Sequence, residues 1–430
     1  MKNTKKISLH QKNNQEKETR LTKILLILFL PYISLSLGQN GFLGLLPFVR
    51  EEFGLSRVQV GYYSTSFFIS ATFVSVFTGN IVDNLGPKKS ILLGIGCMGF
   101  LLMFHGLSTS YTLLLFMAFL AGFGFSIITP SVTKGVILAS PQEKRAISMG
   151  FTQTGFGVGG IAGAILLPLL GKYFGWRAAV QLAAVFILLT GPFVYKFYQE
   201  QNNIRNIFDA PEFHSATKQS FKNNLLSLFT NKMLLRICVF GILFGVLDNA
   251  PPSHFTVFLT EDLGMSKVMA GFGFSILHLG GMIGLLVWGR VSDRFFQSDR
   301  RLGLFLVGLS TGIFYLLFGL FLNHAPISPV VIFFLSFLLG LSSLGWMGVY
   351  LMTVGEVAGS KQAGIATGLA LLFIRIGMLI APPIFGVIAD ISGYYRYSWL
   401  TFGFVITGIF SLFFTKKLRN CITTRNNELP

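Results

Sequence analysis

Twelve long apolar segments take up most of the 430-residue chain, and no other feature of the sequence constrains the fold as strongly. The hydrocarbon core of a bilayer is about 30 Å thick and needs roughly 20 apolar residues in helical form, because an unpaired backbone polar group is very costly there. The segments cover residues 24–46, 59–82, 90–108, 111–137, 147–170, 177–198, 233–259, 268–291, 302–322, 328–354, 364–388 and 397–415. The sequence therefore predicts an all-α integral membrane protein with twelve transmembrane helices.

The charge of the chain supports this topology. Only 12% of the residues are charged, against about 25% in an ordinary soluble chain, which argues against a soluble enzyme or a disordered protein. With the N-terminus in the cytoplasm, the cytoplasmic segments hold 26 Lys and Arg residues and the external segments hold six. This asymmetry is typical of membrane topology. The net charge of +17 therefore indicates contact with anionic lipid of a bilayer and not with nucleic acid.

The same topology predicts the domain organisation. Both termini and the polar stretch between the sixth and seventh spans are expected in the cytoplasm. We expect an N-terminal tail (1–23), a six-helix bundle (24–198), a linker (199–232), a second six-helix bundle (233–415) and a C-terminal tail (416–430).

The second half of the chain repeats the first. A shift of 210 positions places the run Glu51-Glu52-Phe53-Gly54-Leu55-Ser56-Arg57-Val58 on Glu261-Asp262-Leu263-Gly264-Met265-Ser266-Lys267-Val268. The same shift places Gly79 on Gly289 and Asp83 on Asp293, and a shift of 218 places Gly175 on Gly393. The match runs through charged and turn residues, so we interpret it as a duplicated six-span unit.

Two loops carry a family resemblance. The loop after the second span reads Gly79-Asn80-Ile81-Val82-Asp83-Asn84-Leu85-Gly86-Pro87-Lys88-Lys89 and resembles the loop signature of the major facilitator superfamily. The run Gly289-Arg290-Val291-Ser292-Asp293-Arg294 is similar to its second copy, although Phe296 stands at the repeat position of Gly86. The resemblance covers nearly the whole chain. It implies two pseudo-symmetric six-helix bundles, alternating access to a central path, and a monomer.

The resemblance also implies gating residues at the cytoplasmic loops. We expect Asp83 and Asp293 to meet helix N-termini or loop cations such as Arg145 across the seam between the bundles, closing an inner gate. The alternative is that each acid caps its own loop, beside Lys88 or Arg294. Glu356 lies near the inner end of the tenth span, where a gating and a structural role both stay open.

Ionisable residues inside the spans are functional candidates, because a charge there is costly. Asp248 is followed by Asn249 and the helix-breaking Pro251-Pro252, and it can handle a proton. Arg375 keeps its charge and needs a carboxylate, carbonyl oxygens or an anionic substrate. Two arrangements stay open: an ion pair of Arg375 with Asp248, or Arg375 on the substrate with Asp248 coupling a proton. His278 can shuttle a proton or donate a hydrogen bond, and Lys134 can extend to the lipid headgroups or line the path.

Neutral polar residues complete the candidate path. Gln39, Asn40, Gln153 and Asn249 can bind a solute or bond neighbouring helices. Glycines at a spacing of four residues predict close helix packing, and they are Gly155, Gly159 and Gly163 in the fifth span and Gly280 and Gly284 in the eighth.

These residues predict a secondary transporter of a small polar solute. Arg375 favours an anion, and proton coupling stays open. The alternatives are efflux of hydrophobic compounds and a non-transporting membrane sensor or scaffold. The chain has no phosphate-binding glycine loop and no catalytic cluster, and its three cysteines do not fit a metal site, so we expect neither an enzyme nor a cofactor or metal. We expect a bacterial inner membrane as its location.

Overall fold

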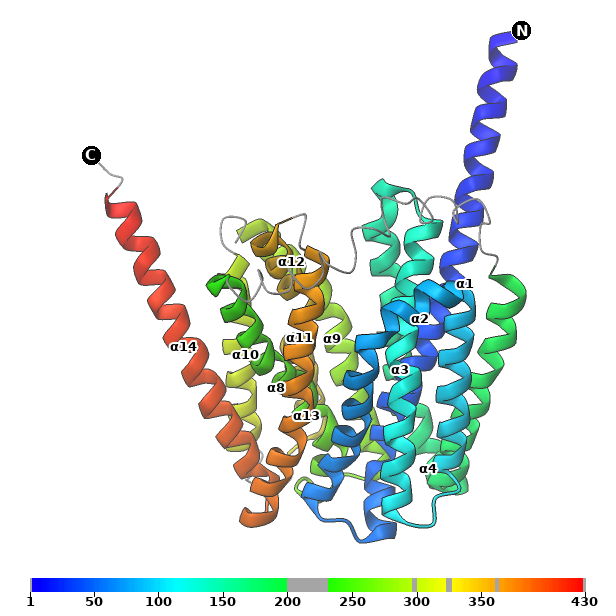
Figure 1. Ribbon diagram of the computed structural model, residues 1–430. Coiled ribbons are helices and arrows are strands. Elements are labelled where there is room, and N and C mark those ends of the chain that lie inside the picture. The colour runs from blue at the N-terminus through cyan, green and yellow to red at the C-terminus, as the bar shows by residue number, and fades with distance from the viewer. Residues whose placement is uncertain (1, 199–230, 296–299, 322–326, 360–362, 428–430) are drawn as a thin grey trace.

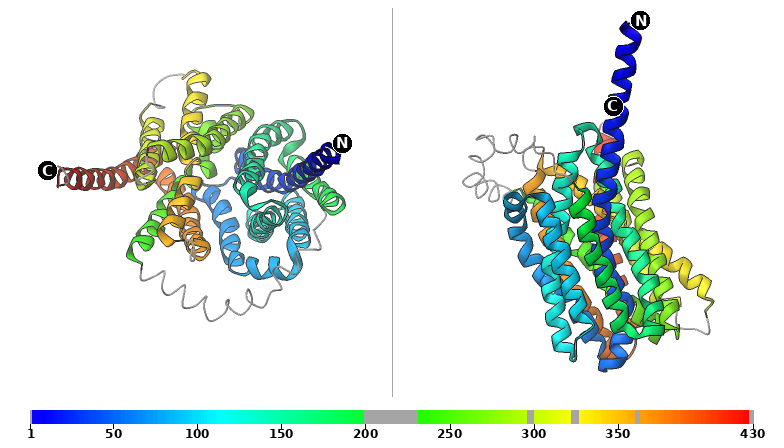
Figure 2. Two further views of the ribbon diagram at one scale, coloured as in Figure 1. Left: turned by 90° about the horizontal axis from the view of Figure 1, so that it is seen from above. Right: turned by 90° about the vertical axis from the view of Figure 1, so that its right-hand side faces the viewer.

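The computed structural model describes residues 2–198, 231–295, 300–321, 327–359 and 363–427, and these ranges are helical without a strand. Two groups of helices lie side by side (Figures 1 and 2). The N-terminal group holds α1 (Lys2–Phe53), α2 (Arg57–His105), α3 (Tyr111–Ala139), η1 (Gln142–Lys144) and α4 (Arg145–Phe197). The C-terminal group holds α8 (Lys232–Glu261), α9 (Lys267–Phe295), α10 (Arg300–Phe321), α11 (Pro329–Ser343), α12 (Met347–Ala358), α13 (Ala363–Ser392) and α14 (Tyr395–Asn427).

Two of the helices turn back on themselves at a glycine. Gly86 in α2 has a φ of 79° and Gly175 in α4 has a φ of 80°, a backbone conformation that side chains with a Cβ rarely adopt. Each glycine lies between two spans that the sequence predicts. α2 and α4 therefore each consist of two helical rods.

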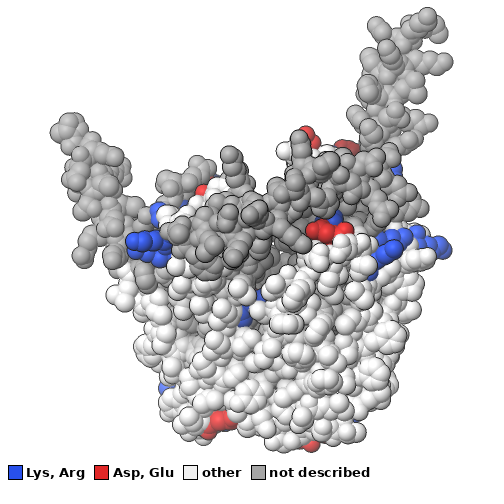
Figure 3. Space-filling view, viewed as in Figure 1, with Lys and Arg blue, Asp and Glu red and all other residues white. Residues whose placement is uncertain are grey.

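Nine helices in the described residues are long and apolar enough to cross a membrane. Counting the two rods of α2 and of α4 separately gives eleven. α14, which those nine do not include, covers the twelfth predicted span. The tenth predicted span is broken into α11 and α12 at residues 344–346. In Figure 3 the visible charged side chains gather mainly near the upper and lower margins, and the band between them is almost free of charge. This distribution is typical of a multi-pass membrane protein.

The outer ends of α1 and α14 extend from one face of the molecule (Figure 1). We name this the terminal face and the opposite one the far face. A chain that crosses the membrane an even number of times has both termini on the same side, as found here. That the terminal face is the cytoplasmic one stays a prediction, and the predicted linker lies mostly outside the described residues.

The predicted glycine packing is confirmed. A Cβ added to Gly155 of α4 would lie 2.7 Å from the Phe29 carbonyl oxygen of α1. In α9, Cβ atoms on Gly280 and Gly284 would overlap carbonyl oxygens of α11. Glycine therefore lets these helix backbones touch.

The duplicated turn has the same geometry in both copies. Gly54 has a φ of 60° and Gly264 a φ of 63°. In each copy the serine two residues later accepts a hydrogen bond of 3.3 Å from a backbone N–H three residues further on. Gly175 and Gly393 likewise share a φ near 80°. Phe296, the departure in the second loop, lies outside the described residues.

Candidate functional site

Two antiparallel helix pairs join the groups, and the first is α2 with α13. From the far face inward, a Cβ on Gly61 would overlap the backbone of Pro382, and the Thr65 hydroxyl donates to the Leu379 carbonyl oxygen over 2.8 Å. The Arg375 guanidinium then donates to the Ala71 carbonyl oxygen over 2.7 Å. Among the hydrogen bonds that the described residues form between these helices, this one lies nearest the terminal face.

The second pair is the first rod of α4 with α9. A Cβ on Gly160 would lie 3.2 Å from the His278 ring, and one on Gly157 would lie 3.1 Å from Met282. Closer to the terminal face, a Cβ on Gly150 or Gly289 would meet no atom within 4 Å. The two groups are therefore in contact toward the far face and diverge toward the terminal face.

Arg375 lies where α2 and α13 diverge. The Ala71 carbonyl oxygen, which accepts the hydrogen bond from Arg375, also accepts one of 2.9 Å from the Ser126 hydroxyl. No carboxylate in the described part of the chain lies within 4 Å of the Arg375 guanidinium. The predicted alternative of an ion pair with Asp248 is therefore absent from this structure. Arg375 instead bridges the groups through a backbone carbonyl.

Asp248 lies inside the C-terminal group. Its neighbours there are the aromatic side chains of Trp346 and Tyr315. Asn249, the next residue, is buried and donates to the Met378 carbonyl oxygen over 2.6 Å. Ser253 donates to the Ser64 hydroxyl of α2 over 2.7 Å and approaches the Asn249 amide at 3.3 Å. In this conformation Asn249 links α8 to α13. Of the two roles predicted for it, binding a solute or bonding a neighbouring helix, the structure shows the second.

The other predicted path residues lie on α1, α4 and α9. Asn40 is buried and donates to the Ser36 hydroxyl over 2.9 Å. Gln39 lies one turn before Leu43, whose carbonyl oxygen accepts from Thr256 of the C-terminal group, so it shares the seam side of α1. The Gln39 Oε1 atom is buried without a hydrogen-bond partner.

His278 has a similar position on α9. Its ring packs against Gly160 of α4, and the Nε2 atom is buried without a hydrogen-bond partner. Gln153 lies one turn before Gly157 and two turns before Gly160, on the face of α4 that contacts α9. It is exposed there, and it lies near Tyr32 of α1. The structure therefore places Gln39, Gln153 and His278 on helix faces that line the seam, and it joins Asn40 to Ser36 of its own helix.

The predicted gating acids pair within their own groups. Asp83 receives the Lys134 ammonium over 2.7 Å. Arg300 donates to Asp293 over 2.5 Å and to Glu356 over 2.6 Å. Among the residues that the structure describes, neither Asp83 nor Asp293 pairs across the seam, and neither uses Lys88 or Arg294 as its partner. The reason is geometric, since the groups diverge at this face and the acids reach only cations of their own group.

Two basic gating candidates also lie within their own groups. Arg145 starts α4 and donates to the Ser140 carbonyl oxygen over 3.4 Å. Arg294 lies over the ring of the adjacent Phe295, with 5.9 Å from its guanidinium carbon to the ring centre. A role of these residues in a closed terminal face stays a prediction.

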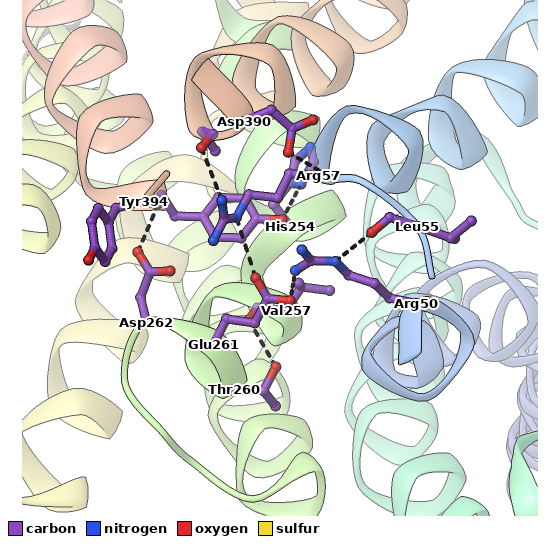
Figure 4. Close-up of polar contacts among 12 residues, drawn as sticks. Arg50, Leu55, Arg57, His254, Val257, Thr260, Glu261, Asp262, Asp390 and Tyr394 are labelled. Atoms are coloured by element: carbon purple, nitrogen blue, oxygen red, sulfur yellow. Dashed lines mark hydrogen bonds and ion pairs between the residues drawn. The ribbon is translucent and has the colours of Figure 1, made fainter. Parts of the chain in front are cut away.

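Sequence reasoning missed a polar network at the far face. It joins Arg50 and Arg57 of the N-terminal group to Glu261 and Asp390 of the C-terminal group (Figure 4). The signal was present, because Arg57 and Glu261 belong to the duplicated turn. Spacing along the chain could not show that the two copies of that turn meet.

A sequence model described as the Major Facilitator Superfamily matches residues 28–370 and 253–420. The match extends over most of the chain and agrees with the paired helix groups. The chain belongs to the Major Facilitator Superfamily.

Of three curated relatives, two are transporters and one is a membrane sensor protein. The sialic acid transporter NanX of Escherichia coli (strain K12) is 24% identical over 354 residues, 82% of this chain and 82% of the relative. The hexuronate transporter of Bacillus subtilis (strain 168) is 21% identical over 388 residues, 88% of this chain and 90% of the relative. The membrane sensor protein UhpC of Escherichia coli (strain K12) is 24% identical over 380 residues, 83% of each chain.

Solved structures share the fold. A bacterial homologue of the human lysosomal transporter Spinster, in an inward-facing and unoccupied conformation, aligns with a TM-score of 0.74 and 16% identity. The alignment covers 93% of this chain and 96% of that chain. At this identity the likeness establishes the fold alone.

Proposed function

We propose that this chain is a secondary transporter that moves a small anionic solute by alternating access, with Arg375 as the cationic contact of the solute. The observation that carries the proposal is the position of Arg375. It lies at the point where the two groups diverge, and no acid of the described residues compensates its charge.

The chemistry of guanidinium supports an anion. The group has five N–H donors, and the described residues give Arg375 one hydrogen bond, to a neutral carbonyl. A charge that is partly removed from water without a counter-ion is costly. A carboxylate or phosphate can accept two parallel hydrogen bonds from the guanidinium and supply that missing charge.

The relatives' names support the same solute class. Sialic acid and hexuronate are both sugars that carry a carboxylate, and NanX and the hexuronate transporter match most of this chain. We therefore propose carboxylated sugars as the first solutes to test. An apolar cargo, as in the efflux alternative, would leave the charge of Arg375 unmatched.

The test is uptake into vesicles by the purified protein. Labelled carboxylated sugars and their neutral parent sugars are compared in the wild type and in Arg375→Gln. Loss of a charge partner in a shielded site costs about 2–5 kcal/mol, so we expect kcat/KM for the carboxylated solute to fall about a hundredfold. Arg236→Gln is the matched control, because it removes the same charge from an exposed position of α8. Equal uptake by both variants contradicts the anion contact.

The sensor UhpC supports a second candidate function. It is as similar to this chain as NanX is, so the fold and its seam also suit a protein that binds a solute and signals. The same vesicles separate the two functions. Binding of a carboxylated sugar without any flux supports a sensor, and flux supports the transporter.

We also propose that the terminal face is cytoplasmic and that Asp248 couples transport to protons. The first proposal rests on the excess of Lys and Arg in the segments on that side. The second rests on a carboxylate of α8 that forms no ion pair within the described residues and lies among aromatic side chains.

A further inference from the structure

Ion pairs at the far face connect the two groups. Glu261, at the end of α8, forms ion pairs with Arg50 and Arg57 of the N-terminal group (Figure 4). The distance from Arg57 Nε to Glu261 Oε2 is 3.3 Å. Lys267, at the start of α9, pairs with Glu51 at the end of α1. In this network an acid of each group therefore pairs with a cation of the other group.

Two of these ion pairs are related by the internal repeat. The shift of 210 places Glu51 on Glu261 and Arg57 on Lys267. The acid of each copy of the duplicated turn pairs with the base of the other copy. Such reciprocal contacts are what a two-fold axis between two like surfaces produces.

The two related pairs have different surroundings. The side chains of Arg57 and Glu261 are 17% and 30% exposed, whereas those of Lys267 and Glu51 are 32% and 70% exposed. Arg50, the second cation on Glu261, is also only 17% exposed. Pairs that are shielded from water contribute more than exposed ones.

Asp390 of α13 strengthens the shielded pair. Its two carboxylate oxygens accept the backbone N–H groups of Arg57 and Val58, each over 2.9 Å. It therefore caps the N-terminus of α2 from the other group, where a negative charge is favoured. The Arg57 guanidinium also donates to the Ala389 carbonyl oxygen over 3.1 Å and lies 5.2 Å from the centre of the Tyr395 ring.

We propose that the two copies of the duplicated turn form a reciprocal ionic gate that keeps the far face closed, with Glu261 and Asp390 as its principal residues and the pair of Glu51 and Lys267 as a minor one. The inference rests on the proposed function, because alternating access requires this face to open. All of these contacts cross the seam, so opening must break them. Their combined strength sets the population of the closed far face.

The surroundings predict an order of effects. Removing the charge of Glu261 leaves two shielded guanidinium groups, those of Arg50 and Arg57, without their shared counter-ion at the closed seam. Removing the charge of Glu51 leaves one ammonium that water reaches. Glu261→Gln should therefore open the far face far more than Glu51→Gln.

The test measures a distance across the far face without any solute. Spin labels are attached at Thr109→Cys, in the turn before α3, and at Val330→Cys, in the first turn of α11. Both positions are exposed, lie at the far face and belong to different groups. The three native cysteines are replaced by alanine in this background. Double electron–electron resonance then gives the populations of short and long distances in vesicles.

Glu52→Gln is the matched control. Glu52 lies in the same turn, but it pairs with Arg177 and accepts a hydrogen bond of 2.5 Å from the Trp176 indole N–H. Both partners belong to its own group. The hydrogen bond from Arg177 lowers the pKa of Glu52, so this control also removes a charge. We expect the ratio of long to short distances to rise about tenfold in Glu261→Gln and to change less than about twofold in Glu51→Gln and Glu52→Gln.

Charge exchange tests the reciprocity. Glu51→Lys places two ammonium groups together and should lengthen the distance, and Lys267→Glu in the same chain should restore it. The gate is overturned if Glu261→Gln matches the wild type, if Glu52→Gln opens the face equally, or if the exchange restores nothing. The distances need no solute, so they test the gate separately from the uptake measurements. A failed anion contact would leave the predicted distances unchanged.

Discussion

At the scale of single residues, the charged groups in the seam divide into paired and unpaired ones. At the terminal face, Asp83, Asp293 and Glu356 each pair with a cation of their own group. Arg375 has a carbonyl oxygen and no acid among the described residues. This difference between Arg375 and the paired groups is the basis of the proposed function.

Asp248 carries the prediction at this scale. If it couples protons, Asp248→Asn should remove the stimulation of uptake by an imposed pH gradient, because an amide cannot take up and release a proton. Exchange of solute at equal concentration and equal pH should fall less than about threefold, since the proposal assigns the proton to Asp248 and the solute contact to Arg375. The measurement compares uptake and exchange in vesicles.

Asn249→Asp provides a contrast for this prediction, because Asn249 bonds the Met378 carbonyl oxygen and holds two helices together. Its replacement should lower thermal stability without a selective loss of the gradient effect. A gradient response that survives in Asp248→Asn would show that another group carries the proton.

At the scale of elements, close backbone contact governs the packing. Gly155 of α4 lies on a carbonyl oxygen of α1, and Gly284 of α9 lies on one of α11. The helices therefore approach more closely than side chains would permit. Gly159 of α4 and Gly377 of α13, which the shift of 218 superimposes, likewise lie on carbonyl oxygens of α1 and α8, so this close contact occurs in both copies of the repeat.

Gly284→Ala tests this packing. Its added Cβ would overlap the Leu341 carbonyl oxygen, and forced overlap of this kind typically costs about 1–3 kcal/mol. We expect a lower midpoint of thermal unfolding in detergent. Gly289→Ala in the same helix is the control, since its Cβ meets no atom within 4 Å and alanine favours helix by up to about 1 kcal/mol. If both variants unfold at the same temperature, the close contact does not contribute to stability.

At the scale of the whole molecule, the structure is closed at the far face and diverges at the terminal face. Along α2 the contacts with α13 extend from Arg57 to Ala71, about 20 Å at 1.5 Å per residue. Beyond Ala71, a Cβ on Gly79 of α2 or on Gly368 of α13 would meet no atom within 4 Å. Alternating access would require the contacts near Arg57 to open and those near Gly79 to form.

The orientation in the membrane gives the prediction at this scale. Epitope tags on the two termini should both be protected from protease in right-side-out vesicles and both be cleaved in inside-out vesicles. A tag at the exposed Thr109 turn should behave in the opposite way. Cleavage of the two terminal tags from opposite sides would contradict an even number of crossings.

The sequence by itself determined the helical segments, the duplicated turn and the glycine contacts, because these follow from short patterns of apolar, turn-forming and small residues. Only the tertiary structure decided which charges meet. Arg375 bonds Ala71 and not Asp248, Asp83 takes Lys134 and not Arg145, and Glu261 binds two cations from far away in the chain. The physical reason is that an ion pair depends on distance in space, and for pairs between the groups that distance depends on how the groups are tilted against each other.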